Sequence, residues 1–436
     1  MSYPDRLSEP AVEHQPGDEW RIAPLPDSVE RASLNRVAII TEAFLPKIDG
    51  VSKLATLTAR HHLNMGRAVL IYAPDLTIGD YATPDMLDGR CPVVKVPSGR
   101  LPNFPPETRG AYPYIKMDEL RRFQPDIVHL FSPAFLAWTG IHYARQQDIP
   151  VVANYQTDLP GYTRRYGVGF MEGFTWSYIR HIHNHTTLTL APTSISLEQL
   201  EAKGFKRLRL WYRGCNTQRF NPAKRSAAMR QRMLNGKPDD SLLVVYVGRL
   251  ANEKRVDLLR EVAQLDGVAV AIVGHGPTED SLHKLFGKTA TFLGFLEGEE
   301  LAQAYASADV FGFTGTNEVA GQVVKEAMAS GLPVLVPASG GIVEYVRPGS
   351  NGFVCAIDPV DYRDKVITLR DNPALRAEMA LNALRDARKL SWEETMARLE
   401  QLYTEALRYH RLHQPVRPTL RTRIRYASSN LRARSH

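Results

Sequence analysis

The chain of 436 residues has a formal net charge of +7, with 44% hydrophobic and 23% charged residues. This length predicts two or more domains, and the composition is typical of a folded globular protein, which excludes a disordered chain. No apolar run reaches the roughly 18 residues of a membrane-spanning helix, and the N-terminus lacks a signal-peptide pattern, so we expect a cytoplasmic protein.

The two ends of the chain differ in composition. Residues 1–35 contain five prolines and seven acids, which predicts a disordered leader. Residues 416–436 carry six arginines and no acid, so this basic tail supplies six of the seven excess positive charges. The sequence therefore predicts local attraction of the tail to an anionic membrane surface, as a surface helix or as a disordered extension, and no general affinity for nucleic acid.

Strand-like and helix-like patterns alternate in residues 36–214. The β-branched runs RVAIIT, AVLIYAP, PVVKVP, DIVHLF and PVVANY predict parallel strands, and VSKLATLTARHHLNMG predicts a helix after the first of them. Gly50 lies where that helix begins, so backbone amides there could face phosphate oxygens, although a turn glycine is the simpler interpretation.

The alternation restarts in residues 215–392, after a polar connector. The runs LLVVYVG, AVAIVG, TFLG, DVFGFT and LPVLVP predict a second parallel sheet. Ser391 is expected to cap a final helix, with Glu394 completing a capping box. We therefore expect an α/β protein of two Rossmann-like domains that face a cleft, with the helix of residues 393–415 packing back toward the N-terminal domain.

Two cations follow the first strand of the second domain. Arg249 and Lys254 lie in YVGRLANEKRVDLL. They could bind a diphosphate, Arg249 through its planar guanidinium and Lys254 through its ammonium, or they could form ion pairs at the solvated surface. Gly274 and Gly276, in GHGPTEDSL, would let backbone approach a ligand closely. The loop lacks the G-x-G-x-x-G fingerprint, which weakens a dehydrogenase interpretation.

Two glutamates lie eight positions apart in FTGTNEVAGQVVKEAMASGLPVLVP. Glu318 is expected in the turn between a strand and a helix, and Glu326 on the helix. Because ligands bind at the carboxyl edge of a parallel sheet, these carboxylates are plausible acceptors for ligand hydroxyls. Together with the two cations and Gly50, they predict a sugar-nucleotide site.

From about residue 36 to residue 407, the chain resembles the retaining GT-B glycosyltransferases of family 4. The resemblance rests on the E-x7-E pattern of Glu318 and Glu326, on GRLANEK and on ASADVF. The segments ITEAFLPKIDGVSK, NYQTDLPGYTRRYG and YRGCNTQRFNP are similar to bacterial mannosyltransferases that use GDP-mannose to make glycolipids. Sulfoquinovosyl-diacylglycerol synthases, which use a UDP-sugar, are a nearby subgroup and the alternative.

This resemblance implies roles for particular residues. Arg249 and Lys254 bind the diphosphate, Glu318 accepts hydroxyls of the donor sugar, and Glu326 accepts ribose hydroxyls. The donor site it implies comprises Gly50, Arg249, Lys254, Gly274, Gly276, Glu318, Gly321, Gln322 and Glu326. It further implies a peripheral enzyme on the inner face of the cell membrane, with a lipid acceptor, no required cofactor and no metal.

The chain departs from the family pattern at several positions. Gln156 stands where many relatives have histidine, Asn216 where aspartate is common, and His275 where an acid is frequent. Around Glu318 the flanking residues also differ, namely Asn317, Val319 and Ala320. The donor sugar is therefore less firmly predicted than the reaction type, and a soluble or polysaccharide acceptor and a catalytically silent scaffold stay open.

Two further groups of polar residues have alternative interpretations. Asp158, Tyr162 and Arg164 could contact the acceptor, or could belong to a solvated loop. His181 and His185 have the i, i+4 spacing of metal ligands, but no third ligand is evident nearby, so we expect a structural role. The three cysteines are far apart and lack metal-ligand spacing, which predicts reduced thiols.

Overall fold

The computed structural model describes most of the chain between residues 34 and 413. The described ranges are 34–44, 50–75, 89–100, 109–111, 117–157, 159–165, 169–316, 318 and 321–413. The predictions for the leader up to residue 33, for Asp158 and for the basic tail lie outside these ranges. Within them, no helix has both the length and the apolar character that crossing a membrane requires.

The first sheet has seven parallel strands in the order β3-β2-β1-β6-β7-β8-β9. Its strands are β1 (Arg36–Thr41), β2 (Ala68–Pro74), β3 (Val93–Val96), β6 (Ile127–Phe131), β7 (Val151–Asn154), β8 (Leu188–Ala191) and β9 (Leu208–Leu210). The central strands are buried on both faces, which is why they consist of continuous apolar, often β-branched runs. A separate antiparallel pair joins β4 (Ser98–Arg100) to β5 (Arg109–Ala111).

The second sheet has six parallel strands in the order β12-β11-β10-β13-β14-β15. Its strands are β10 (Leu242–Val247), β11 (Val268–Val273), β12 (Ala290–Gly294), β13 (Val310–Gly312), β14 (Val334–Pro337) and β15 (Gly352–Cys355). Strands β10 and β13 are therefore neighbours, although the residues that pair between them, Val244 with Val310 and Val245 with Phe311, lie 66 positions apart in the sequence. Two parallel sheets, each connected through helices, confirm the predicted α/β fold class with two Rossmann-like domains.

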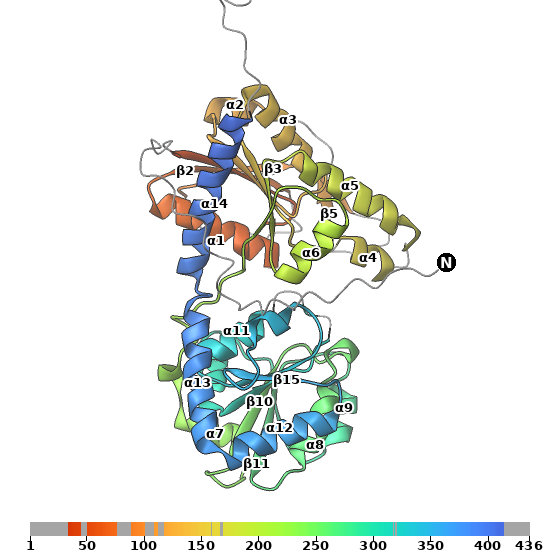
Figure 1. Cartoon of the computed structure of the whole chain (residues 1–436), viewed down its shortest axis with the longest axis vertical. Coiled ribbons are helices and arrows are strands. Elements are labelled where there is room, and N and C mark those ends of the chain that lie inside the picture. Colours follow the sequence, from red (N-terminus) through yellow and green to blue (C-terminus); the bar gives the residue numbers. More distant parts are fainter. Residues whose placement is uncertain are drawn as a thin grey trace, which may run out of the picture. The chain divides into compact units, whose positions relative to one another are not determined.

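Helices cover both faces of each sheet (Figure 1). Around the first sheet these are α1 (Gly50–Asn64), α2 (Asp118–Phe123), α3 (Ala137–Gln147), α4 (Leu159–Arg165), η1 (Gly169–Met171), α5 (Glu172–Asn184), α6 (Ser194–Ala202) and α14 (Trp392–Leu412). Around the second they are η2 (Pro222–Lys224), α7 (Ala227–Leu234), η3 (Asn252–Lys254), η4 (Val256–Leu259), α8 (Arg260–Ala263), α9 (Glu279–Phe286), α10 (Gly298–Ser307), α11 (Gln322–Ala329), η5 (Gly341–Tyr345), α12 (Pro359–Asp371) and α13 (Pro373–Arg388).

The alternation of side chains along β1 explains the layers of the first domain. Val37 and Ile39 join a core cluster with α1 and α14, whereas Ala38 and Ile40 join another with α2 and α3. Successive strand residues point to opposite faces, so one apolar run supplies both cores. The last helix in the described part of the chain, α14, therefore completes the core of the first domain.

The start of α14 agrees with the prediction in part. The hydroxyl of Ser391 accepts a hydrogen bond from the backbone N–H of Glu394 at 3.1 Å, which confirms the predicted cap. The reciprocal half of the capping box is wrong, because the N–H of Ser391 donates to the carbonyl of Arg388 at 3.3 Å.

The chain joins its two halves through two segments that lie beside each other. The N–H of Cys215 donates to the carbonyl of Leu390 at 2.8 Å, and the N–H of Trp392 donates to the carbonyl of Cys215 at 3.2 Å. The indole N–H of Trp211 donates to the carbonyl of Thr395 at 2.9 Å. These bonds fix the beginning of α14 to the connection between the sheets.

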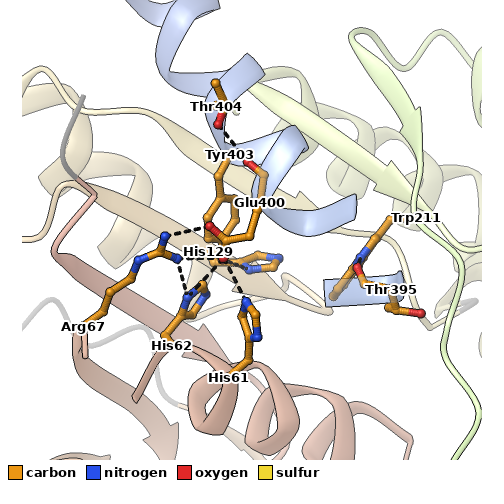
Figure 2. A network of polar contacts seen from close by, with 9 residues as sticks. All are labelled: His61, His62, Arg67, His129, Trp211, Thr395, Glu400, Tyr403 and Thr404. Carbon is orange, nitrogen blue, oxygen red and sulfur yellow. Dashed lines mark hydrogen bonds and ion pairs between the residues drawn. The ribbon is translucent and has the colours of Figure 1, made fainter. Parts of the chain in front are cut away.

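A polar cluster anchors the middle of α14 to the first domain (Figure 2). The guanidinium of Arg67 donates to both carboxylate oxygens of Glu400 at 2.7 Å each, and also to Nδ1 of His62 at 3.0 Å. Burial opposes ionisation of Glu400, but hydrogen bonds from His61 and Arg67 outweigh it and hold the pKa of Glu400 at about 2. The carboxylate is therefore charged throughout the physiological pH range.

This cluster also contains the one group of three metal-ligand side chains found among the described residues, His61, His62 and Glu400. The guanidinium of Arg67 already bonds both His62 and Glu400. A second cation at that place would be repelled by the arginine, so we interpret the cluster as an ion-pair anchor.

Candidate functional site

The structure brings together Lys254 and Glu318 from two neighbouring loops. Lys254 ends η3, just after β10, and Glu318 follows β13, so both lie beyond the carboxyl ends of adjacent parallel strands. The ammonium of Lys254 donates to Oε2 of Glu318 at 2.6 Å, and both side chains are only about a quarter exposed. The hydroxyl of Thr314 donates to the carbonyl of Lys254 at 2.6 Å, which ties the two loops together.

Arg249 is placed differently from Lys254. Its guanidinium pairs with Glu253 in the same loop and is 58% exposed. Its carbonyl accepts a hydrogen bond from the hydroxyl of buried Tyr246 at 3.2 Å, so its backbone is fixed while its side chain reaches solvent. A side chain in this state can turn toward an incoming anion at the cost of one exposed ion pair, which is weak.

The glycines of the GHGP loop have a packing role in this structure. A Cβ atom on Gly274 would lie 2.0 Å from the carbonyl oxygen of Gly248, and one on Gly276 would lie 2.1 Å from that of Leu250. Any side chain would therefore separate the two loops. The N–H of Leu250 donates to the carbonyl of His275 at 2.9 Å, so this loop supports the one that carries Arg249 and Lys254.

Gly321 is the residue before α11. Its φ is 51°, in the left-handed region, and a Cβ atom there would lie 2.4 Å from Cγ2 of Ile342. Glycine is therefore required by both the backbone and the packing at this position. The carbonyl of Glu318 accepts a hydrogen bond from the N–H of Gly341 at 3.1 Å, which fixes the backbone of Glu318 to the start of η5.

Glu326 projects from α11 into a largely buried environment. Burial raises the pKa of Glu326, whereas a hydrogen bond from Tyr305 and the charges of Lys53, Lys325 and Arg213 lower it. The hydroxyl of Tyr305 donates to Oε2 of Glu326 at 3.2 Å. Lys53 and Arg213 alone outnumber the one carboxylate, so this part of the molecule has a positive local charge, which suits an anionic ligand.

Lys325 is a buried lysine that the sequence analysis missed. Its side chain is fully buried, its ammonium donates to the carbonyl of Arg213 at 2.6 Å, and it lies 5.0 Å from the ring centre of Tyr345. Burial lowers the pKa of Lys325 to about 7. The signal in the sequence was a lysine inside the otherwise apolar stretch VVKEAMA, directly before Glu326.

Gln322 acts beside Lys325, one helical turn earlier on α11. Its amide donates to the carbonyl of Gly214 at 2.6 Å, while its Oε1 has no partner among the described residues. The two side chains of α11 therefore hold the carbonyls of two consecutive residues, Arg213 and Gly214. Donor binding by Gln322 stays a prediction.

Gly50 begins α1 and lies close to Arg213. A Cβ atom on Gly50 would lie 2.6 Å from Nη1 of Arg213, so glycine leaves room for that guanidinium. Three residues further along α1, burial and the charge of Arg213 lower the pKa of Lys53, and Glu326 acts in the opposite direction. The beginning of α1 thus shares its electrostatic surroundings with Glu326.

The residues predicted to meet the acceptor are described only in part. Tyr162 and Arg164 lie on α4, but their side chains lie outside the described part of the chain, as do Asn317, Val319 and Ala320. A small pocket lies next to α4, at the carboxyl ends of β6 and β7. Its lining consists of Ser132, Pro133, Asn154, Tyr155, Gln156, Thr157, Leu159, Ile179 and His183.

The pocket contains unsatisfied polar atoms. Neither Nδ2 of Asn154 nor Oε1 of Gln156 has a hydrogen-bond partner among the described residues. One is a donor and the other an acceptor, which is the combination that a hydroxyl group can satisfy. Burial lowers the pKa of His183 to about 3, so its imidazole is neutral there.

The histidine pair on α5 has a structural explanation. The rings of His181 and His185 lie 4.4 Å apart, and Trp138 contacts both at 5.4 and 5.7 Å. Nδ1 of His185 lies 2.7 Å from the carbonyl oxygen of His181. Among the described residues no third ligand joins this pair, and the rings pack against the indole instead.

Comparisons with known proteins agree with this geometry. Residues 48–219 match the model of Glycosyltransferase Family 4, and residues 230–386 match that of Glycosyl transferases group 1. The chain is 39% identical to the GDP-mannose-dependent alpha-mannosyltransferase of Mycobacterium tuberculosis, over 87% of this chain and 98% of that protein. It is 36% identical to the sulfoquinovosyl transferase SQD2 of Arabidopsis thaliana, over 68% of this chain and 60% of that protein.

Solved structures share the fold at low sequence identity. Anabaena Alr3699/HepE in complex with UDP has a TM-score of 0.64 and 18% identity, covering 85% of this chain and 100% of that one. Sucrose-phosphate synthase from Thermosynechococcus elongatus has a TM-score of 0.65 and 21% identity, covering 85% and 98%. The two family matches, together with the mannosyltransferase similarity over most of both chains, show that this chain belongs to the GT-B glycosyltransferases of group 1 and family 4.

Proposed function

We propose that this glycosyltransferase moves mannose from GDP-mannose onto a membrane glycolipid, such as a glycosyl-diacylglycerol, with retention of the anomeric configuration. The observation that carries the proposal is the 39% identity to a GDP-mannose-dependent alpha-mannosyltransferase over 98% of that protein. The pairing of Lys254 with Glu318 supports it. The two side chains lie next to each other, so the ammonium could bind a phosphate of the donor while the carboxylate binds hydroxyls of its sugar.

In this proposal, four residues bind different parts of the donor. Lys254 and Arg249 bind the diphosphate, Glu318 accepts hydroxyls of the sugar, and Glu326 accepts those of the ribose. When the anomeric bond breaks, negative charge grows on the β-phosphate, and fixed cations stabilise it most in the transition state. Lys254 then leaves Glu318 in part and turns to the phosphate, which frees carboxylate lone pairs for the sugar.

Retention follows if the acceptor hydroxyl attacks on the side from which the nucleotide leaves. The acceptor proton passes to the departing phosphate oxygen, so the bond to the acceptor forms as the bond to the diphosphate breaks. This route needs no carboxylate nucleophile. The proposal also places the enzyme on the inner face of the cell membrane, where its lipid acceptor lies, and it requires no metal.

A donor screen tests the proposal. Purified protein is given GDP-mannose, UDP-glucose or UDP-sulfoquinovose with a total lipid extract, and the product linkage is determined by NMR. We expect an α-mannosyl lipid as the product with GDP-mannose, and no transfer with either of the other two donors. Transfer of sulfoquinovose would favour the alternative suggested by the 36% identity to SQD2. Absence of both transfer and nucleotide release with all three donors would instead favour a catalytically silent protein.

A further inference from the structure

Four large apolar side chains are exposed on neighbouring segments of the first domain, namely η1, the start of α5 and the turn before α3. Phe170 is 87% exposed, Phe174 68%, Phe135 41% and Met171 39%. Phe170 and Met171 lie in η1, Phe174 lies in the first turn of α5, and Phe135 precedes α3. We call these four residues the aromatic surface. A contiguous apolar surface of this kind marks an interaction site in a soluble protein.

The aromatic surface is held in place by Tyr178, one turn after Phe174 on α5. The rings of Phe174 and Phe135 each lie 6.3 Å from the ring of Tyr178. The indole N–H of Trp138 donates to the hydroxyl of Tyr178 at 3.3 Å, and that hydroxyl donates to the carbonyl of Ala134 at 3.4 Å. The rings of Phe135 and Phe174 therefore pack on Tyr178, whose hydroxyl is hydrogen-bonded to Trp138 and to the backbone.

The chemistry of this region favours a lipid bilayer as the partner. Residues 159–185 contain three arginines and one glutamate, a net charge of +2 without the histidines, which complements an anionic surface. Segments whose sequence combines aromatic residues with arginine are typical of the membrane interface. The most exposed ring, Phe170, projects from a single-turn helix, and fluid acyl chains can accept such a ring without a matching cavity.

The same helix lines the small pocket on its other side. Ile179 and His183 of α5 line that pocket, which Gln156 also lines, whereas Phe174 on the same helix is exposed and packs on Tyr178, as Phe135 does. Pro133 lines the pocket, and Phe135 of the aromatic surface follows two residues later. Only the thickness of α5 and this short turn separate the two features.

We propose that the aromatic surface inserts into the interface of an anionic bilayer and brings the pocket beside Gln156 to the lipid headgroups. The lipid-acceptor part of this inference rests on the proposed function. The insertion itself rests on the exposed side chains and on the net positive charge of residues 159–185, and is therefore tested separately from catalysis.

The test uses the full chain and vesicles of phosphatidylglycerol and phosphatidylcholine. Flotation is measured in about 1 M salt, where the Debye length is about 3 Å and attraction through the basic tail is screened. The double variant Phe170→Ser/Phe174→Ser is compared with Phe295→Ser/Leu381→Ser, which removes two apolar side chains that are each 65% exposed in the second domain. Release of GDP from GDP-mannose is measured in both.

We expect the first variant to bind vesicles about tenfold more weakly or worse, because two aromatic rings no longer leave water. The control should bind as the unmodified protein does, and Phe170→Leu/Phe174→Leu should restore most of the binding. GDP release should be equal in all variants. If GDP release is absent even in the unmodified protein but the binding pattern holds, the proposed function fails and the bilayer site stands.

Two results would overturn the bilayer site. One is equal vesicle binding by the serine variant of the aromatic surface and by the unmodified protein. The other is a dimer of the unmodified protein that becomes monomeric in the serine variant without lipid, because the surface would then be covered by a second copy of the chain.

Discussion

Replacing Glu318 by alanine is the sharpest test of the site. If this carboxylate bonds sugar hydroxyls in the transition state, its loss costs about 2–4 kcal/mol, which corresponds to a roughly 30- to 1,000-fold lower rate of transfer. The structural cost is smaller. Lys254 loses its partner at 2.6 Å but is 21% exposed, so water can solvate its ammonium and the free energy of unfolding falls by only about 1 kcal/mol.

The assay compares initial rates of mannosyl transfer, GDP affinity by calorimetry and urea unfolding for Glu318→Ala and the unmodified protein. Glu279→Ala is a matched control, since Glu279, at the start of α9, is a similarly exposed carboxylate paired with His275 at 2.9 Å. It should keep its activity. An unchanged rate in Glu318→Ala would refute the assignment, and a loss of GDP affinity as large as the loss of rate would place the carboxylate on the nucleotide instead.

The other predictions address the remaining charged groups. Glu326→Ala should weaken the binding of free GDP, and calorimetry showing unchanged affinity would count against the ribose role. Lys254→Ala should lower turnover strongly with any donor, and inhibition by EDTA that a divalent ion reverses would contradict the metal-free mechanism. Lys325 has a folded pKa of about 7, lowered from 10.5, so the unfolded chain binds more protons between these values and stability rises with pH there. From pH 6 to pH 9 this rise is about 2–3 kcal/mol by urea unfolding, and Lys325→Met should lack it. Truncation after Pro415 should weaken binding to anionic vesicles at low salt, by about 1 kcal/mol per arginine removed, without changing nucleotide release.

The strands could be predicted where they are long and buried. The run RVAIIT matches β1 in both bounds, because a central strand of a parallel sheet is apolar on both faces. The short strands β8, β9 and β15 were missed. Each has only three or four residues, which is too short for a clear sequence pattern. These segments are strands because their backbones hydrogen-bond to a neighbouring strand.

The sequence singles out candidate site residues, whose roles stay predictions, but it could not predict which of them pair. Lys254 and Glu318 lie 64 positions apart, and they meet because β10 and β13 are adjacent in the sheet, which no local pattern encodes. Lys325 was overlooked for a similar reason. A lysine on a helix is expected in water, and only the distant carbonyl of Arg213 explains its burial.

The position of α14 has a consequence for how the protein is made. Leu399 and Tyr403 share a core cluster with Val37 of β1, so the first domain stays incomplete until nearly the whole chain has been synthesised. The second sheet, from β10 to β15, is already finished by then. Once residues up to about 390 have left the ribosome, the second domain can be complete while the first domain still exposes the apolar face that α14 will cover, and this is the stage at which chaperones and proteases have most access to the nascent chain.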